Sequence, residues 1–263
     1  MSKTRKALLV LLALAVLKRP VDMMLAAMLP DSAVNPVPPC IAGMVAAVLM
    51  MGLPAWLLHP WTSPRLTRQK LVWPGGMMGA GAALLTRAAM TPADAAWQAT
   101  LGLTPDAVPV PESVPLAMLY VVALVIVPAL AEESFFRGAL LTGLLDGARR
   151  VTAAALTVLS FVLLHGSMAN LPSLLVLSLL LTLLMLRTGR IAVPMAAHLV
   201  YNLTALGWMD IPVWVSILCG AGLIGLYVRL ITGQPRVAHP PMKLPDALIV
   251  ALTLAVLILA AVL

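Results

Sequence analysis

In PALAEESFFRGALLTGLLDG, residues 128–147, two adjacent carboxylates and an arginine interrupt an otherwise apolar helix. The chain has three glutamates, and two of them, Glu132 and Glu133, lie here. Charges inside a membrane span are costly unless they are paired or hydrated, so they usually mark a functional site. Glu133 and Arg137 share one helix face, whereas Glu132 is rotated by about 100°. We therefore expect Arg137 to neutralise Glu133 and Glu132 to face a cavity. The alternative is a salt bridge that only holds helices together.

The composition of the whole chain is that of a membrane protein. Its 263 residues are 62% hydrophobic and 10% charged, with a mean hydropathy of +1.02, and membrane spans need about 20 apolar residues each. The net charge of +7 comes from 17 basic residues in small groups between apolar runs, a pattern typical of topology signals rather than of nucleic-acid binding. Cys40 and Cys219 show no metal-site or disulfide spacing and are interpreted as packing residues.

Apolar runs predict an all-α, polytopic transmembrane helix bundle of eight or nine spans. After a first segment at about 6–29 they lie at 37–58, 72–90, 114–146, 151–169, 171–187, 190–207, 212–232 and 245–263. Basic and acidic loops alternate, which places the basic loops in the cytoplasm and the acidic loop 91–113 outside. We predict one integral-membrane domain, 1–263, with a catalytic core at 114–207. Segment 1–36 holds either a first span interrupted at its middle or an interfacial helix.

Two further apolar runs carry histidines. His165 follows Phe161 by one helical turn and His198 precedes Asn202 by one turn, so each pair shares a helix face. A lone histidine on an apolar helix usually has a structural role. Two histidines together with an asparagine, a pair of glutamates and an arginine instead favour a functional site. At 1.5 Å per residue, His165, His198 and Glu132 lie about 22, 12 and 20 Å from the cytoplasmic side. The groups can therefore meet near mid-membrane.

These residue types suit peptide-bond hydrolysis. A carboxylate and an imidazole that share a water can remove its proton while it attacks a carbonyl. A second imidazole and an amide NH₂ can donate hydrogen bonds to the oxyanion that forms. Neither a serine nor a cysteine nucleophile is required.

Three motifs then resemble those of a known family. Glu-Glu-x-x-x-Arg at 132–137, Phe-x-x-x-His at 161–165 and His-x-x-x-Asn at 198–202 are similar in order and spacing to the motifs of the CPBP family. This family comprises the CAAX proteases and bacteriocin-processing enzymes, which are intramembrane glutamic proteases related to the Rce1-type CAAX endopeptidase. The resemblance covers about 114–207.

The resemblance implies a role for each residue of the set. Glu132 would activate the water together with His165, and His198 and Asn202 would stabilise the oxyanion, without a metal or other cofactor. Supporting positions would be Glu133, Arg137 and Phe161. Eukaryotic family members cut the C-terminal tripeptide from prenylated proteins. For this chain we expect a membrane-anchored peptide or protein as substrate, the bilayer of a prokaryotic cytoplasmic membrane as its location, and no nucleic-acid partner.

Three other interpretations stay open at this point. A zinc-dependent membrane protease could use Glu132, His165 and His198 as ligands, although no HExxH helix is present. A proton-coupled transporter could use the same groups as a relay, but we find no inverted repeat. A non-catalytic immunity or binding protein could retain the scaffold.

Overall fold

The structure, a computed structural model, describes residues 2–29, 35–58, 73–104, 108–208 and 246–253, together with residues 212, 214, 215, 218 and 222. Every regular element in these ranges is a helix, which confirms the all-α prediction. The chain divides into two compact units. The first comprises Met1–Arg65, Pro111–Leu156 and Ala238–Leu263, and the second comprises Leu66–Val110 and Thr157–Val237. Both contribute to the predicted core 114–207, and the single-domain organisation stays a prediction.

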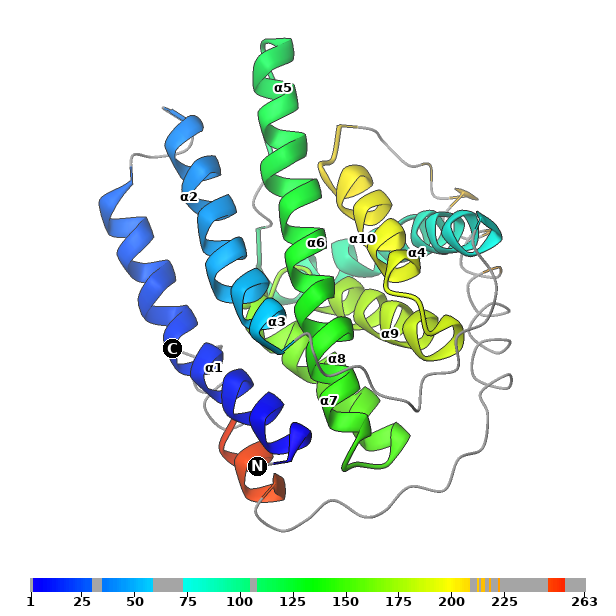
Figure 1. The fold of residues 1–263 in the computed structure, drawn as a ribbon. Coiled ribbons are helices and arrows are strands. Elements are labelled where there is room, and N and C mark those ends of the chain that lie inside the picture. The colour runs from blue at the N-terminus through cyan, green and yellow to red at the C-terminus, as the bar shows by residue number, and fades with distance from the viewer. Residues whose placement is uncertain are drawn as a thin grey trace. The chain divides into compact units, whose positions relative to one another are not determined.

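In the first unit, two other helical runs pack against one long helical run (Figure 1). That long run is α5 (Val114–Tyr120), η2 (Val121–Ile126), α6 (Val127–Glu133), η3 (Ser134–Leu140) and α7 (Leu141–Leu145), where η denotes a π-helical turn. On it pack α1 (Lys3–Met28) and the run of α2 (Val37–Ala47), η1 (Val48–Gly52) and α3 (Leu53–Leu58). The Glu-Glu pair therefore lies on the helical run that contacts both of the other runs in this unit.

Close packing of α1 on α7 depends on a glycine. A Cβ at Gly143 would lie 2.9 Å from the Cβ of Ala7 and 3.5 Å from the carbonyl oxygen of Lys3. The hydroxyl of Thr4 donates a hydrogen bond of 2.9 Å to the Gly143 carbonyl. A small residue lets the two backbones approach this closely.

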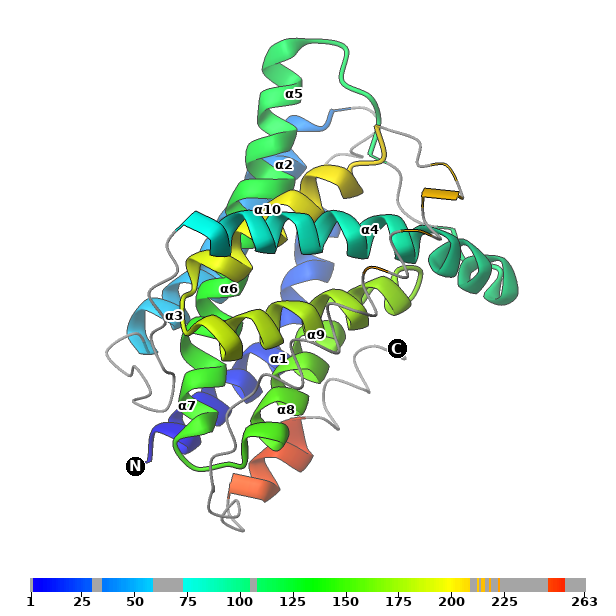
Figure 2. The ribbon, with the colours of Figure 1, turned by 90° about the vertical axis from the view of Figure 1, so that its right-hand side faces the viewer.

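The second unit contains α4 (Trp73–Leu101), the end of α8 (Arg150–His165), α9 (Leu171–Thr188) and α10 (Ala192–Ala205). Figure 2 shows α4 beside α9 and α10, and it contacts both. Leucines at i, i+3, i+4 and i+7 of α9 form one apolar stripe. The core consists of Leu177, Leu180, Leu181, Leu183 and Leu184 with Ala82, Ala83, Val193, Ala197 and Tyr201.

Among the described residues, three helices are long and apolar enough to cross a membrane: Val37–Leu58, Val114–Leu145 and Leu171–Thr188. They agree with the spans predicted at 37–58, 114–146 and 171–187. The apolar helix α8 is shorter, and α10 occupies part of the predicted 190–207. The count of eight or nine spans stays a prediction, because 212–232 and 245–263 lie largely outside the described residues, as does Cys219.

The structure corrects two expectations about individual segments. The interruption expected in the middle of the first segment is absent from the backbone, because α1 stays helical from Lys3 to Met28 with Pro20 inside it. The loop expected at 91–113 begins later than predicted, because α4 continues past Pro92 to Leu101. Residues 91–101 are therefore helical, and their polar side chains lie on a helix face instead of in a loop.

Candidate active site

The predicted ion pair between Glu133 and Arg137 is confirmed. Nη1 of Arg137 donates to Oε1 of Glu133 at 2.6 Å, and both side chains are fully buried, with 0% of their surface exposed. The one-turn spacing along α6 and η3 brings the two side chains onto one face. A buried charge is tolerated when an opposite charge and hydrogen bonds compensate its lost hydration. The pair thus neutralises one carboxylate of the Glu-Glu sequence.

Glu132 has a different environment from its neighbour. It is partly exposed, whereas Glu133 is buried, because consecutive helical side chains point about 100° apart. The two adjacent carboxylates are therefore not equivalent, as the helical spacing predicts. That Glu132 faces a catalytic cavity stays a prediction.

His165, the last residue of α8, is held in one tautomer. Its Nδ1 lies 2.8 Å from the carbonyl oxygen of Phe161, and because a carbonyl oxygen can only accept, Nδ1 carries the hydrogen. In the neutral ring Nε2 then has a lone pair. A histidine in this tautomer can accept a proton at Nε2, as a general base requires.

Phe161 packs against both histidines of the predicted set. Its ring centroid lies 4.2 Å from that of His165 and 5.7 Å from that of His198. Phe161 itself is fully buried and His198 is 2% exposed. The supporting role expected for Phe161 therefore has a physical basis, since its ring fixes the separation of the two imidazoles.

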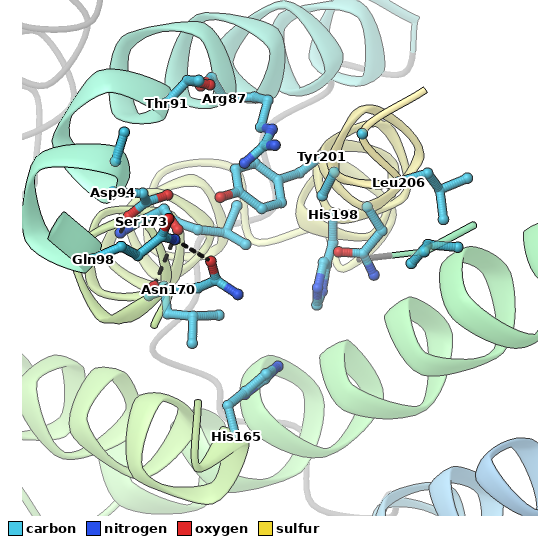
Figure 3. Close-up of a pocket in the computed structure, with 17 residues that line it drawn as sticks. Arg87, Thr91, Asp94, Gln98, His165, Asn170, Ser173, His198, Tyr201 and Leu206 are labelled. Carbon is cyan, nitrogen blue, oxygen red and sulfur yellow. Dashed lines mark hydrogen bonds between the residues drawn. The ribbon is translucent and has the colours of Figure 1, made fainter. Parts of the chain in front are cut away.

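A cavity of about 450 Å³ opens among the helices of the second unit. His165 of α8 and His198 of α10 line it (Figure 3), and so does Asn202 of α10. Asn202 is one turn after His198 on α10, so its amide faces the same cavity. The volume lies in the range of sites for small ligands.

The opposite wall of this cavity was not predicted from the sequence. It is lined by Arg87, Thr91, Asp94 and Gln98 of α4, whose spacing of i, i+4, i+7 and i+11 puts them on one helix face. This periodicity was the available signal. The sequence does not reveal this wall, because Thr91, Asp94 and Gln98 all fall within the predicted loop 91–113.

Hydrogen bonds attach α4 to the segment between α8 and α9 and to the first turn of α9. Oδ1 of Asp94 accepts from the backbone N–H of Ser173 at 3.0 Å. The indole N–H of Trp97 donates to the carbonyl oxygen of Met168 at 2.9 Å. The side-chain NH₂ of Gln98 donates to the carbonyl oxygen of Ala169 at 3.0 Å. These bonds fix the segment that directly follows His165.

The predicted site residues are divided between the two units. The first unit contains Glu132, Glu133 and Arg137, whereas Phe161, His165, His198 and Asn202 belong to the second, where the structure brings them together. The approach of Glu132 to the histidines stays a prediction. Within either unit, the described residues contain no group of three His, Cys, Asp or Glu side chains arranged to hold a metal ion.

Long apolar helices, together with a cavity lined by two histidines and an asparagine, indicate an integral membrane protein with a candidate catalytic site. Residues 114–204 match the sequence model of the Rce1-like family, described as type II CAAX prenyl endopeptidase Rce1-like. This segment is similar to the Rce1-like family, which confirms the resemblance predicted from the three motifs, and every predicted site residue lies within it. The match indicates a CAAX-type intramembrane protease. No curated protein matches the chain, and no solved structure does.

Proposed function

We propose that this protein is a glutamic intramembrane endopeptidase that cleaves a membrane-anchored peptide or protein in a prokaryotic cytoplasmic membrane. The observation that carries the proposal is the convergence of His165, His198 and Asn202 on one cavity. The Rce1-like match over the same segment supports it.

In the proposed reaction, Glu132 and His165 bind the attacking water. As its oxygen bonds to the carbonyl carbon of the substrate, its proton passes to this pair and the carbonyl electrons move to the oxygen. The hydrogen that His165 donates from Nδ1 to the Phe161 carbonyl leaves Nε2 as the accepting nitrogen.

His198 and Asn202 would donate hydrogen bonds to the oxyanion of the tetrahedral intermediate. Donors fixed in advance in a dry site stabilise developing charge strongly, typically by a factor of about 10²–10³ in kcat for one donor. Collapse of the intermediate restores the carbonyl and breaks the C–N bond. The proton taken from water is then delivered to the departing amine, which leaves one carboxylic acid and one amine as products.

Glu133, Arg137 and Phe161 support these groups without contacting the reacting atoms. The ion pair of Arg137 with Glu133 leaves Glu132 as the carboxylate of the two that is not fully buried. Phe161 keeps the imidazoles of His165 and His198 at fixed separations. A set that is held in advance loses little free energy to reorganisation during the reaction.

The test compares protein termini in membrane and secreted fractions of the native host that expresses wild type, Glu132→Gln or Glu112→Gln at equal levels. Glu112 is an exposed glutamate outside the motifs, so its substitution makes the same chemical change as a control. We expect new termini with wild type and Glu112→Gln and their loss with Glu132→Gln. Termini that are identical in all three strains would contradict the proposal and favour a transport or binding role.

Two further measurements separate the proposed mechanism from its competitors. His165→Ala should abolish the same cleavage, while its elution from a size-exclusion column stays that of wild type. Cleavage by the purified protein should persist in a chelator. Tightly bound zinc at one ion per chain, with activity lost on its removal, would instead identify a metalloprotease.

A further inference from the structure

The wall of the cavity formed by α4 is not used by the proposed reaction. Arg87 and Asp94 line it from one helix face, and Figure 3 shows Arg87 extending toward Tyr201, with Asp94 close to Ser173 and Gln98. An arginine and a carboxylate in an apolar unit are costly to bury, so their presence in a cavity calls for an explanation.

Several polar groups on and beside this wall are already engaged. Oδ1 of Asp94 accepts from Ser173, and Oδ1 of Asn170 lies 3.4 Å from the donating amide of Gln98. The hydroxyl of Thr91 donates to the Arg87 carbonyl at 2.9 Å. These contacts hold the wall in place. The Asp94 carboxylate and the Tyr201 hydroxyl both lie within electrostatic reach of the Arg87 guanidinium.

The charge of Arg87 has no ion-pair partner in the part of the chain that the structure describes. In the same part of the chain, the Nε of Arg87 is buried and has no hydrogen-bond acceptor. The Oδ2 of Asp94 is likewise buried and has no hydrogen-bond donor, and the Asp94 residue as a whole is only 4% exposed. One ligand that brings both a carboxylate and an N–H would satisfy both groups. A peptide has this combination.

We propose that Arg87 binds a carboxylate of the peptide substrate, in the same cavity in which His165, His198 and Asn202 act on the scissile bond. A guanidinium is always charged and can donate two parallel hydrogen bonds to a carboxylate. The carboxylate is either the free C-terminus or an Asp or Glu side chain close to the cut. Asp94 Oδ2 accepts a substrate N–H beside it. This inference rests on the proposed peptidase function and deepens it.

The experiment uses the full-length protein in detergent and a mixture of synthetic peptides that carry an N-terminal lipid anchor. The mixture contains two kinds of matched pair. In the first kind, the same peptide is present with a free C-terminal carboxylate and with a C-terminal amide. In the second kind, a peptide that contains Asp or Glu is paired with the same peptide containing Asn or Gln instead. Mass spectrometry of competing cleavage gives the ratio of kcat/KM within every pair. The proteins compared are wild type, Arg87→Gln, Arg87→Lys and Arg149→Gln.

With wild type we expect the charged member of one kind of pair to be cleaved about tenfold faster or more, as for a charge-assisted hydrogen bond. The kind of pair that shows the preference identifies the source of the carboxylate. Arg87→Gln should bring that ratio close to one. Arg87→Lys should leave an intermediate ratio, because lysine keeps the positive charge but lacks the two parallel N–H donors of the guanidinium. Arg149, an exposed arginine that does not line the cavity, serves as the control, and Arg149→Gln should keep the wild-type ratio.

Other results would overturn the inference. Equal cleavage of both members of every pair by wild type refutes the carboxylate site while the peptidase function stands, and this arm does not depend on the folding of any variant. A ratio that persists in Arg87→Gln, with all rates reduced alike, assigns Arg87 a structural role. If folded wild type cleaves no peptide of the mixture, the endopeptidase proposal fails on these substrates and the inference fails with it.

Discussion

Replacing Arg137 by methionine tests whether its charge is required to compensate Glu133. The two side chains are fully buried and joined by a 2.6 Å hydrogen bond, and methionine keeps much of the length of arginine without its charge. Removing one partner of a buried pair leaves the other uncompensated and typically costs about 3–5 kcal/mol. For a chain of this length, about 2 °C per kcal/mol gives an expected decrease in Tm of about 6–10 °C.

A matched control is available on α1. Lys18 and Asp22 have the same one-turn spacing and the same 2.6 Å separation, but their side chains are 30% and 50% exposed. Because exposed ion pairs contribute about 0–1 kcal/mol, Lys18→Met should lower Tm by no more than about 2 °C. Tm would be measured in one detergent from the fraction of protein that stays monodisperse after heating, at one heating rate for all variants.

A double variant completes the test. When Glu133→Leu is added to Arg137→Met, the fully buried charge of Glu133 is removed as well, so we expect much of the lost Tm to return. The reasoning is refuted if Arg137→Met shifts Tm as little as Lys18→Met does. It is also refuted if the double variant is less stable than Arg137→Met by the full cost of a second independent substitution.

Three further predictions concern the cavity of the second unit, the ring of Phe161 and, separately, helix packing in the first unit. Asn202→Ala should lower kcat by about 10²–10³ with little change in KM or Tm, as measured with a peptide that wild type cleaves. Phe161→Ala should cost about 3–5 kcal/mol of stability, whereas Phe161→Leu should retain most of it and still lower kcat, because it no longer contacts both imidazoles. Gly143→Val should lower Tm relative to Gly81→Val, since a Cβ at Gly143 meets Ala7 at 2.9 Å and one at Gly81 meets nothing within 4 Å.

Helix periodicity in the sequence predicted the local features well. The pairing of Glu133 with Arg137 and the different environment of Glu132 both follow from 100° per residue and appear in the structure. Each of these features depends on residues within two helical turns. The cost of burying charge in an apolar segment then decides which pairing forms.

The wall formed by α4 could not be predicted in the same way. Pro92 and the polar residues after it are typical of a loop, yet α4 continues to Leu101. Bonds to a remote segment stabilise this extension: Asp94 accepts from Ser173, and Trp97 and Gln98 donate to the carbonyls of 168 and 169. A segment with such polar residues stays helical when their side chains form hydrogen bonds to residues distant in the sequence. A single sequence does not identify those distant partners.

Phe161 shows why the spacing of a motif has a structural cause. Side chains on a helix point back toward its N-terminus, so Nδ1 of His165 reaches the carbonyl of the residue one turn earlier, and the two rings lie in contact at an interplanar angle of 39°. A residue at that position therefore sets both the tautomer and the tilt of the imidazole. The tautomer depends on the backbone carbonyl, which any residue at 161 supplies, whereas the separation from His198 depends on the ring of Phe161. Changes of side chain at this position should consequently alter the geometry of the site while His165 keeps the nitrogen that accepts the proton.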